Sequence, residues 1–411
     1  MPWTEFSPKA LRSIDESTAR LNIWHGAVRS SKTVSSMVRW IQYIDAAPPG
    51  DLLMIGKTER TLGRNILNPM QEILGQQRMH WNRGAGEVFI AGRRIYIVGA
   101  NDERAEQKIR GLTIAGAYAD EITLYPESFF VMLLSRLSVP GAKLFGTTNS
   151  DSSYHWLKEN YLDREDLNLR QWHFELEDNL SLDPQFVDDL KREYVGLWYK
   201  RYILGLWVAA EGAIYDMFDI DKHEVDNLPV TEDGRPAIKR SWVLIDYGTT
   251  NPTVFLWLVQ CADNCLYVAD EWRWDSAERG RQKSDPEYSK DLRDFLQRIG
   301  HRPQWIFIDP SAASFIVQCS NDRIPNIAGA DNSVLDGIRY TSSLLSANRL
   351  KFIKGKCEGT IKEMLGYVWD ANAQKHGEDK PVKAHDHGPD CIRYGVNSSR
   401  LYWEPWLRKA A

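Results

Sequence analysis

The sequence has no long apolar run. None of its hydrophobic stretches approaches the roughly 20 residues that a helix needs to cross a bilayer, and the opening residues MPWTEFSPKALRSI lack the apolar core of a secretory signal. The five cysteines are an odd number, and they form neither the CxxC pairs of a zinc site nor a dense disulfide framework. We therefore expect a cytosolic protein with free thiols and no membrane partner.

An excess of positive charge is also missing. The formal net charge is −5, which argues against a protein that merely coats nucleic acid. Residues 239–411 hold 24 Lys and Arg against 22 Asp and Glu, a net charge of +2, whereas residues 1–238 hold 27 against 34, a net charge of −7. Any contact with nucleic acid should therefore depend on local patches of charge, more of them in the second half.

The length and the pattern of the chain predict two α/β domains. A chain of 411 residues exceeds what one hydrophobic core usually supports. A stretch rich in Gly, Pro and acidic residues interrupts the periodicity and predicts a linker at 209–238 between domains at 1–208 and 239–411. In the first half, β-rich runs alternate with helical patterns, which is typical of a parallel sheet covered by helices. Strands are expected there at residues 21–25, 52–57, 94–98, 114–119 and 143–148, followed by a helix-rich stretch from about 153 to 206. In the second half, the pattern predicts a three-strand meander, a helix at 288–299, the strand WIFIDP and a closing helix near residue 389.

The run GAVRSSKT fits the phosphate-loop pattern GxxxxGK[ST] except at Ser31, which replaces the second glycine. An expected strand precedes it and apolar residues at helical spacing follow it, so backbone amides at the helix start can face phosphates. Lys32 would pair with the β and γ phosphates of ATP, and the Thr33 hydroxyl would hold Mg2+. A basic turn before a helix is the alternative, and Ser31 would adopt a backbone geometry that glycine reaches more cheaply. The candidate ATP-binding residues are Gly26, Arg29, Ser30, Ser31, Lys32, Thr33 and Asp120.

The run IAGAYADEIT predicts an apolar strand that ends in Asp120 and Glu121. Asp120 can support the Mg2+ shell while Glu121 polarises the attacking water. A solvated strand end is the alternative, but the pair lies in the same half as the phosphate loop. The next strand closes on Thr147, Thr148 and Asn149. In P-loop motors a polar strand end at this place can sense the γ-phosphate, although the alternative, that such a run is only a turn, is the more common case.

In the second half, three carboxylates stand where metal ligands are expected. Asp246 ends the apolar strand WVLI, Asp309 ends WIFI, and Asp390 follows Pro389, which suits the first turn of a helix. Carboxylates that converge from two strand ends and a helix start make an oxygen cage for Mg2+ or Mn2+, and two such ions can cleave a phosphodiester. A single aspartate at a strand end is usually only a turn former, so the prediction depends on the set.

These segments together resemble the large terminase subunits, the DNA-packaging motors of tailed bacteriophages. The resemblance covers nearly the whole chain in order, through GAVRSSKT, KIRGLTIAGAYADEIT, LFGTTNS, VLIDYGTTNPT, FIDPS and AHDHGPDCIRYGV. It implies an N-terminal P-loop ATPase domain with a parallel-rich sheet and a C-terminal RNase H-like nuclease domain with a mixed sheet. ATP hydrolysis would drive double-stranded DNA into a viral procapsid, and a two-metal nuclease would cut concatemeric DNA.

The resemblance also implies roles for individual residues, with ATP and Mg2+ as cofactors and Mg2+ or Mn2+ at the nuclease site. The implied partners are double-stranded DNA, the portal protein, the small terminase subunit and further copies of the chain in a ring of five on the procapsid, in the cytoplasm of the infected bacterium. The matched residues are Lys32 and Thr33 (Walker A), Asp120 (Walker B), Glu121 (catalytic glutamate), Thr147, Thr148 and Asn149 (coupling motif), Asp246, Asp309 and Asp390 (nuclease carboxylates), and His387, which matches a histidine of some members.

Several cations have less definite roles. One in the phosphate loop, Arg29, and three elsewhere in the first half could stabilise transition-state charge in cis or in trans, although a solvated arginine is the alternative for each. These three arginine-finger candidates are Arg60, Arg110 and Arg136. A cationic loop with interleaved tryptophans predicts DNA contact, or else is only a solvated loop; it contains Arg273, Arg279, Arg281 and Lys283.

Two other functions remain open at this stage. A helicase or translocase of DNA repair can also join a P-loop half to a nuclease half, and a DNA-binding scaffold could carry degenerate sites.

Overall fold

The computed structural model describes residues 5–248 and 251–407 and divides the chain into two compact units. The first consists of the residues up to Ala209 together with Lys375–Glu378, and the second of the remaining residues. Almost all of the expected linker at 209–238 belongs to the second unit, which contains α9 (Ile220–His223) and β9 (Glu224–Val225).

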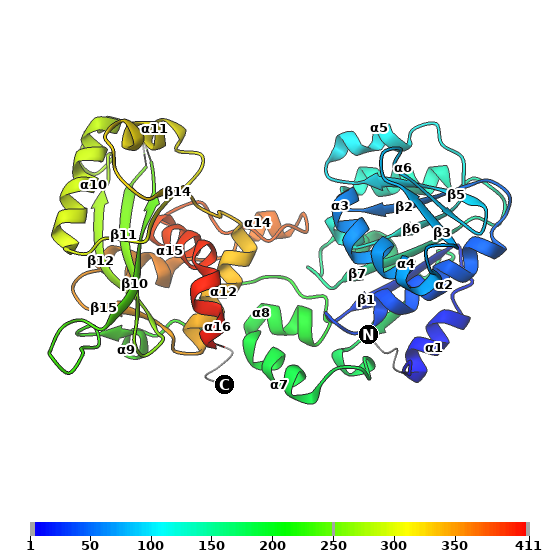
Figure 1. Ribbon diagram of the computed structural model, residues 1–411, viewed down its shortest axis with the longest axis horizontal. Coiled ribbons are helices and arrows are strands. Elements are labelled where there is room, and N and C mark those ends of the chain that lie inside the picture. Colours follow the sequence, from blue (N-terminus) through cyan, green and yellow to red (C-terminus); the bar gives the residue numbers. More distant parts are fainter. Residues whose placement is uncertain (1–4, 249–250, 408–411) are drawn as a thin grey trace. The chain divides into compact units, whose positions relative to one another are not determined.

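The first unit is built on an eight-stranded sheet (Figure 1) with the order β3-β4-β5-β2-β6-β7-β1-β8. All pairs are parallel except β3 with β4 and β4 with β5, which form an antiparallel edge. The strands are β1 (Leu21–Gly26), β2 (Asp51–Gly56), β3 (Met79–Asn82), β4 (Glu87–Ile90), β5 (Arg93–Gly99), β6 (Ile114–Ala119), β7 (Lys143–Asn149) and β8 (Leu169–Phe174).

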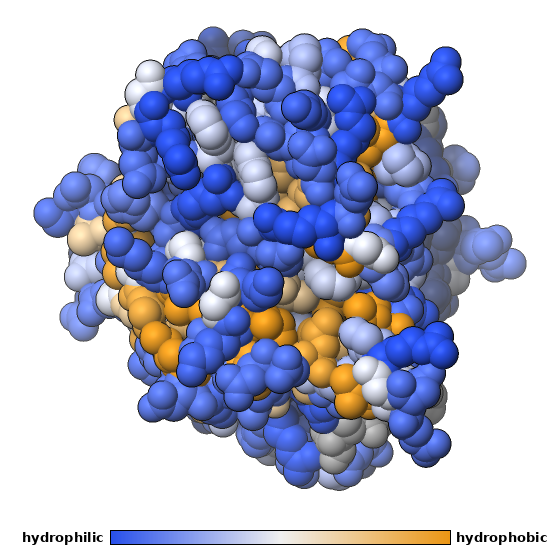
Figure 2. Space-filling model, turned by 90° about the vertical axis from the view of Figure 1, so that its left-hand side faces the viewer, coloured by the Kyte–Doolittle hydropathy of each residue, from blue (hydrophilic) through white to orange (hydrophobic). Residues whose placement is uncertain are grey.

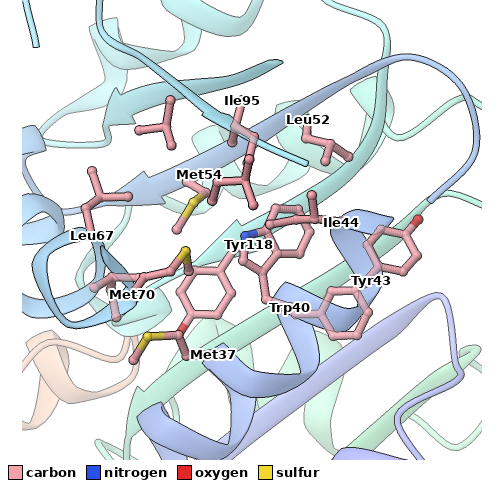
Figure 3. Packing of buried hydrophobic residues seen from close by; sticks show 14 of the residues in the cluster. Met37, Trp40, Tyr43, Ile44, Leu52, Met54, Leu67, Met70, Ile95 and Tyr118 are labelled. Carbon is pink, nitrogen blue, oxygen red and sulfur yellow. The ribbon is translucent and has the colours of Figure 1, made fainter. Parts of the chain in front are cut away.

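Apolar clusters lie on both faces of this sheet. Successive residues of β2 alternate between them, because Leu52 and Met54 enter one cluster and Leu53 and Ile55 the other. Figure 3 shows residues of α2 packed against the first of these faces, which fixes the start of that helix beside the end of β1. The helices are α1 (Pro8–Asp15), α2 (Lys32–Ala46), α3 (Glu59–Leu62), α4 (Asn68–Leu74), α5 (Glu106–Ile109), α6 (Glu127–Arg136), α7 (Pro184–Glu193) and α8 (Gly196–Trp198).

The five strands expected in the first half are present as β1, β2, β5, β6 and β7. The hairpin of β3 and β4 was not predicted, because two strands of four residues each are too short for a clear alternation. The expected helix-rich stretch from about 153 to 206 is more mixed: it contains strand β8, the short helices α7 and α8, and π-helical segments at Lys158–Leu162 and Tyr199–Ile203.

The second unit is built on a seven-stranded sheet with the order β14-β13-β10-β11-β12-β15-β9. The pairs β10 with β11 and β11 with β12 are antiparallel and form the expected meander, whereas the other pairs are parallel. The prediction of an α/β fold with a parallel-rich first sheet and a mixed second sheet is confirmed. The further strands are β10 (Ile238–Asp246), β11 (Thr253–Cys261), β12 (Leu266–Trp274), β13 (Trp305–Ile308), β14 (Ile327–Gly329) and β15 (Leu350–Ile353).

Helix α15 (His387–Ser398) packs directly on β10. A Cβ added to Gly395 would lie 2.3 Å from the Leu244 side chain, so the glycine is what allows this close approach. Residues of α10 (Asp285–Ile299) and α11 (Ala313–Asn321) share an apolar cluster with β10 and β11. The remaining helices are α12 (Val334–Ser346), α13 (Glu358–Gly366), α14 (Ala371–Gln374) and α16 (Arg400–Leu407).

Figure 2 shows the face at the left of Figure 1, where hydrophilic side chains predominate and apolar ones gather in the lower part. All five cysteines are buried and free. In the described ranges, no helix is long and apolar enough to cross a membrane.

Candidate active sites

The phosphate-loop candidate lies between β1 and α2. Gly26 has a φ of 128°, and a Cβ there would lie 2.1 Å from the Phe174 carbonyl oxygen, so only glycine fits. Ser31 has a φ of 67°, and Arg29 has a φ of 56°. The left-handed geometry expected at Ser31 is therefore present, and backbone strain of this kind clusters at functional sites.

Lys32, the first residue of α2, is buried beneath this loop. Its Nζ donates to the Ala27 carbonyl oxygen at 2.7 Å and to Asn149 Oδ1 at 2.7 Å. Burial lowers the pKa of Lys32 to about 8, although the charges of Asp120 and Glu121 oppose the shift. The site therefore holds a desolvated cation that a phosphate group would stabilise.

Asp120 and Glu121 follow the buried strand β6. Burial raises the pKa of Asp120 to about 6, and the charge of Glu121 adds to the shift. Thr147 Oγ1 donates to Asp120 Oδ1 at 2.7 Å and accepts from the Glu121 backbone N–H at 3.3 Å. Glu121 itself has a φ of 59°, so the acidic pair is held in a strained turn.

The end of β7 connects these two motifs, because β7 lies between β6 and β1 in the sheet. Thr147 binds Asp120, and Asn149 binds Lys32. Thr148 Oγ1 lies 2.7 Å from Thr123 Oγ1 in the turn after Glu121. The three segments expected to form one site are thus joined by direct hydrogen bonds.

Sequence reasoning missed a buried arginine, Arg201, that belongs to the same region. It pairs with Asp151, two residues after Asn149, at 3.0 Å, and it donates to the Val208 carbonyl oxygen at 2.6 Å. The Ser150 hydroxyl donates to the Gly205 carbonyl oxygen at 2.5 Å. A charged pair of residues in the otherwise apolar run LWYKRYILGLWV is the signal that could have drawn attention to this arginine.

Residues 202–207 also contact the phosphate loop. The Val28 backbone N–H donates to the Tyr202 carbonyl oxygen at 2.9 Å. Trp207 Nε1 donates to His25 Nδ1 at 3.2 Å, and burial lowers the pKa of His25 to about 3, so the ring stays neutral and can accept. The segment that leads out of the first unit is therefore tied to both the phosphate loop and the end of β7.

The arginine-finger candidates are placed less decisively. Arg29, Arg60 and Arg110 are exposed, and Arg136 is half-buried at the end of α6. In the described part of the chain, the only side-chain partner of Arg136 is the neighbouring Ser135 hydroxyl, at 3.1 Å. Among the residues that the structure describes, none of these four side chains reaches Lys32 or Asp120 by a hydrogen bond.

In the second unit, Asp246 and Asp309 lie side by side. Strands β10 and β13 are parallel with Ile245 opposite Ile308, so both aspartates leave the same edge of the sheet. Hydrogen bonds from the Ser311 backbone N–H and the Tyr394 hydroxyl lower the pKa of Asp309, although burial opposes the shift.

Helix α15 brings His387 to this edge. Its Nδ1 donates to Asp246 Oδ2 at 2.7 Å. Burial raises the pKa of Asp246, and the nearby charges of Asp390 and Asp386 raise it further, although the bond from His387 opposes the shift. Burial alone would lower the pKa of His387, but the bond to Asp246 raises it. The site therefore has more negative charge than its buried surroundings favour.

Asp390 is held differently from the two strand-end aspartates. It is buried, and its carboxylate pairs with Arg393 at 3.0 Å and with Lys383 at 2.9 Å. Within residues 5–248 and 251–407, no three His, Cys, Asp or Glu side chains are close enough together to hold a metal ion. The expected cage of three carboxylates is not assembled in this arrangement, in which Asp390 pairs with two cations instead.

The expected DNA-contact loop has mostly internal ion pairs. Arg273 binds Glu363 at 2.9 Å and Glu271 at 2.8 Å, and the Glu363 carboxylate also accepts from the Gly388 backbone N–H at the start of α15. Through Glu363, Arg273 helps to hold the start of the helix that carries His387. The positive charge of Arg273 is balanced by these two acids. The other cations of this loop pair with acids or stack on a ring: Lys283 with Asp291, Arg281 with Glu287, and Arg279 over the Trp274 ring.

Fold and sites together define a P-loop ATPase unit joined to a second α/β unit whose mixed sheet has acidic residues at one edge. A family model described as "Terminase large subunit, T4likevirus-type, N-terminal" matches residues 52–222. The chain is 37% identical to the large terminase from a thermophilic bacteriophage, over 96% of this chain and 99% of that one, with a TM-score of 0.85. It belongs to the bacteriophage large terminase family.

Further structures of that thermophilic phage terminase give the same likeness. Its complex with ADP matches at 37% identity over 97% of this chain and 100% of that one, with a TM-score of 0.84. Its complex with ATP-gamma-S matches at 37% identity over 96% and 99%, with a TM-score of 0.83. A comparison with curated proteins gives no match. The family predicted from the sequence is confirmed, and the chain is an enzyme of DNA packaging with ATPase and nuclease activities.

Proposed function

We propose that the first unit binds ATP with its phosphates on the loop from Gly26 to Thr33. The observation that carries this proposal is the desolvated ammonium of Lys32, which has only the uncharged acceptors Ala27 and Asn149 as hydrogen-bond partners in the described ranges. The β and γ phosphates would replace these acceptors with full negative charges. The ADP and ATP-gamma-S complexes of the thermophilic phage terminase support a nucleotide in this unit.

Asp120 and the Thr33 hydroxyl would hold the Mg2+ that accompanies ATP. These residues fit a magnesium ion, because Asp120 is a buried carboxylate beside the carboxylate of Glu121 and its negative charge is shielded from solvent. When bound, the ion would supply positive charge that stabilises the charge developing on the phosphates. Glu121 would orient the attacking water and accept its proton.

The end of β7 would report hydrolysis to the rest of the motor. Asn149 has to release Lys32 when Lys32 turns to a phosphate, and Thr147 has to follow Asp120. Movement of this strand end reaches Asp151 and, through Arg201, the chain at Val208, just before the second unit begins. This chain of contacts is our proposed route from ATP hydrolysis to movement.

The second unit would cleave DNA with metal ions held by Asp246, Asp309 and Asp390, with His387 as a further ligand or as a positioning residue. The fit rests on the excess negative charge at this edge and on the ammonium of Lys383, which Asp386 and Asp390 hold between them. A divalent cation would compete with that ammonium. When bound, it would activate water and stabilise the leaving oxygen.

As partners we propose double-stranded DNA, the portal protein and the small terminase subunit, with five copies of the chain forming a ring on the procapsid in the cytoplasm of the infected bacterium. Family membership supports these partners. A repair translocase with a nuclease would move DNA without a procapsid, so dependence of movement on procapsids separates the two functions.

The decisive experiment measures ATP turnover and plasmid cleavage side by side, with and without Mg2+ or Mn2+. Lys32→Ala should abolish turnover and leave cleavage intact, whereas Asp309→Asn should do the opposite, because the two sites lie in different units. Turnover that survives Lys32→Ala would refute the nucleotide site. Cleavage that survives Asp309→Asn would leave the second unit without its proposed nuclease centre.

A further inference from the structure

The first unit contains a segment with an excess of positive charge, although the first half of the chain as a whole is negatively charged. Residues 57–94 contain seven Lys and Arg against three Asp and Glu, a net charge of +4, within a half of the chain whose net charge is −7. Three of the seven are engaged within the fold: Lys57 and Arg93 donate to backbone carbonyls, and Arg94 pairs with Asp51.

The other four cations of this segment face solvent. They are exposed, and in the described ranges none of them forms an ion pair with a carboxylate. This distinguishes them from Arg273, Arg281 and Lys283 of the second unit, whose charges are balanced by acids. The four exposed residues are Arg60, Arg64, Arg78 and Arg83.

Trp81 brings the helical segment and the hairpin into one surface. Gly63 stands between Arg60 and Arg64 in the sequence, and a Cβ added to it would lie 2.7 Å from the Trp81 ring. The Arg83 guanidinium carbon lies 4.4 Å from the centroid of the same ring. We call the surface formed by Arg60, Arg64, Trp81 and Arg83, with Arg78 just before β3, the Trp81 face.

The core holds this face in place. Leu67 and Met70 on the same run of helix turn inward toward Met37 and Tyr118 (Figure 3), and Met79 of β3 is buried. With the inner side fixed, the arginines on the outer side are presented from a rigid base. Pre-placed guanidinium groups lose less conformational entropy on binding than mobile ones.

We propose that the Trp81 face binds the phosphate backbone of double-stranded DNA, an inference that rests on the proposed packaging function. Guanidinium groups bind phosphate in a bidentate manner, and unpaired cations release counterions when they meet DNA. A motor that moves DNA of any sequence needs backbone contacts rather than base contacts. Arg60 belongs to this face and is therefore a DNA contact rather than an arginine finger.

The first test measures duplex binding by the full chain in EDTA, which removes divalent ions and so prevents cleavage. Fluorescence anisotropy at salt concentrations from about 0.05 to 0.2 M gives the slope of log K against log salt. The double variant Arg64→Gln and Arg83→Gln should reduce this slope by about 1.8, since each lost phosphate contact removes about 0.9. Affinity at about 0.1 M salt should fall by roughly 60-fold, because each contact is worth about 0.9 log units there relative to 1 M.

The controls separate charge from structure. The variant Arg64→Lys and Arg83→Lys keeps both charges and should retain the wild-type slope. Arg164→Gln removes an exposed arginine that pairs with Asp166 on the same unit and should change nothing. An unchanged slope in the double Gln variant would overturn the proposal.

A second measurement locates the contact directly. Phenylglyoxal modifies accessible guanidinium groups, and mass spectrometry reports which arginines react. Saturating duplex should protect Arg60, Arg64, Arg78 and Arg83 but not Arg164. Equal labelling with and without DNA would contradict the Trp81 face as the contact.

ATP turnover without DNA, measured on the same preparations, keeps the two proposals distinguishable. The Gln variants should retain wild-type turnover, because neither side chain forms a hydrogen bond with Lys32, Asp120 or Glu121 in the described ranges; there, Arg64 forms a hydrogen bond only with the neighbouring Asn65. If turnover instead survives Lys32→Ala, the proposed function fails whatever the slope shows. If turnover behaves as proposed and the slope does not change, only the DNA surface is wrong.

Discussion

Replacing Asp120 by Asn should stabilise the first unit while it abolishes ATP turnover. Burial raises the pKa of Asp120 from an ordinary value of 3.8 to about 6, a value that already includes the attraction of Lys32. At about 1.36 kcal/mol per pKa unit, ionised Asp120 costs the nucleotide-free fold about 3 kcal/mol at neutral pH. Asn keeps the shape of the side chain and removes this cost, but it is a poorer ligand for Mg2+.

The pH dependence gives the sign of the effect. The folded protein retains the Asp120 proton up to about pH 6, whereas the unfolded chain releases it near 3.8. The wild-type protein therefore loses stability as the pH rises through this window and levels off above it. The advantage of Asp120→Asn should be about 3 kcal/mol at pH 8 and about half of that at pH 5.

Calorimetry without nucleotide or Mg2+ measures this difference. For a unit of about 200 residues, 3 kcal/mol corresponds to a rise in Tm of about 6 to 12 °C. Asp188→Asn, at an exposed position on α7, is the matched control and should leave Tm unchanged. The reasoning would be refuted if Asp120→Asn had a Tm no higher than that of the wild type at pH 8. It would also be refuted if the rise in Tm at pH 5 were as large as the rise at pH 8.

Three further predictions concern hydrolysis, coupling and cleavage. Glu121→Gln should bind ATP, measured by fluorescent-nucleotide titration, but hydrolyse it at least about 100-fold more slowly, because general base catalysis is lost; normal turnover would reject its role. Arg201→Gln should lower the length of DNA packaged per ATP hydrolysed more than turnover itself, and an unchanged ratio would rule out the proposed route. Asp390→Asn should stop plasmid cleavage, whereas Asp386→Asn should only weaken it. If Asp386→Asn has the larger effect, the third metal ligand is Asp386 and not Asp390.

The strands that position the catalytic motifs could be predicted from the sequence. β1 and β10 end in Gly26 and Asp246, and Asp120 directly follows β6, so the candidate residues could be found at the ends of these strands. The local sequence shows that an acidic residue follows an apolar strand. The parallel pairing of two such strands then places their acidic residues at the same edge of the sheet. Asp246 and Asp309 could be placed together on this basis.

The sequence could not predict contacts between segments that are far apart in the chain. Arg201 meets Asp151 across 50 positions, and Arg273 meets Glu363 across 90. Nothing local distinguishes an arginine with such a partner from one that faces solvent. The DNA-contact loop stays a prediction; in the structure Lys283 and Arg281 pair with acids on the helix that follows.

The serine at the second glycine position of the phosphate loop also has a structural explanation. A left-handed residue other than glycine costs about 1 kcal/mol or more, so Ser31 persists because its surroundings hold it. Its hydroxyl donates to the Asp178 carbonyl oxygen at 3.3 Å, and Asn179 Nδ2 donates to the Arg29 carbonyl oxygen at 2.6 Å. The Asp178 carboxylate in turn pairs with Lys9 of α1 at 2.7 Å. A glycine would relax the backbone but lose the hydroxyl contact, so in this chain the serine ties the loop to the segment that follows β8.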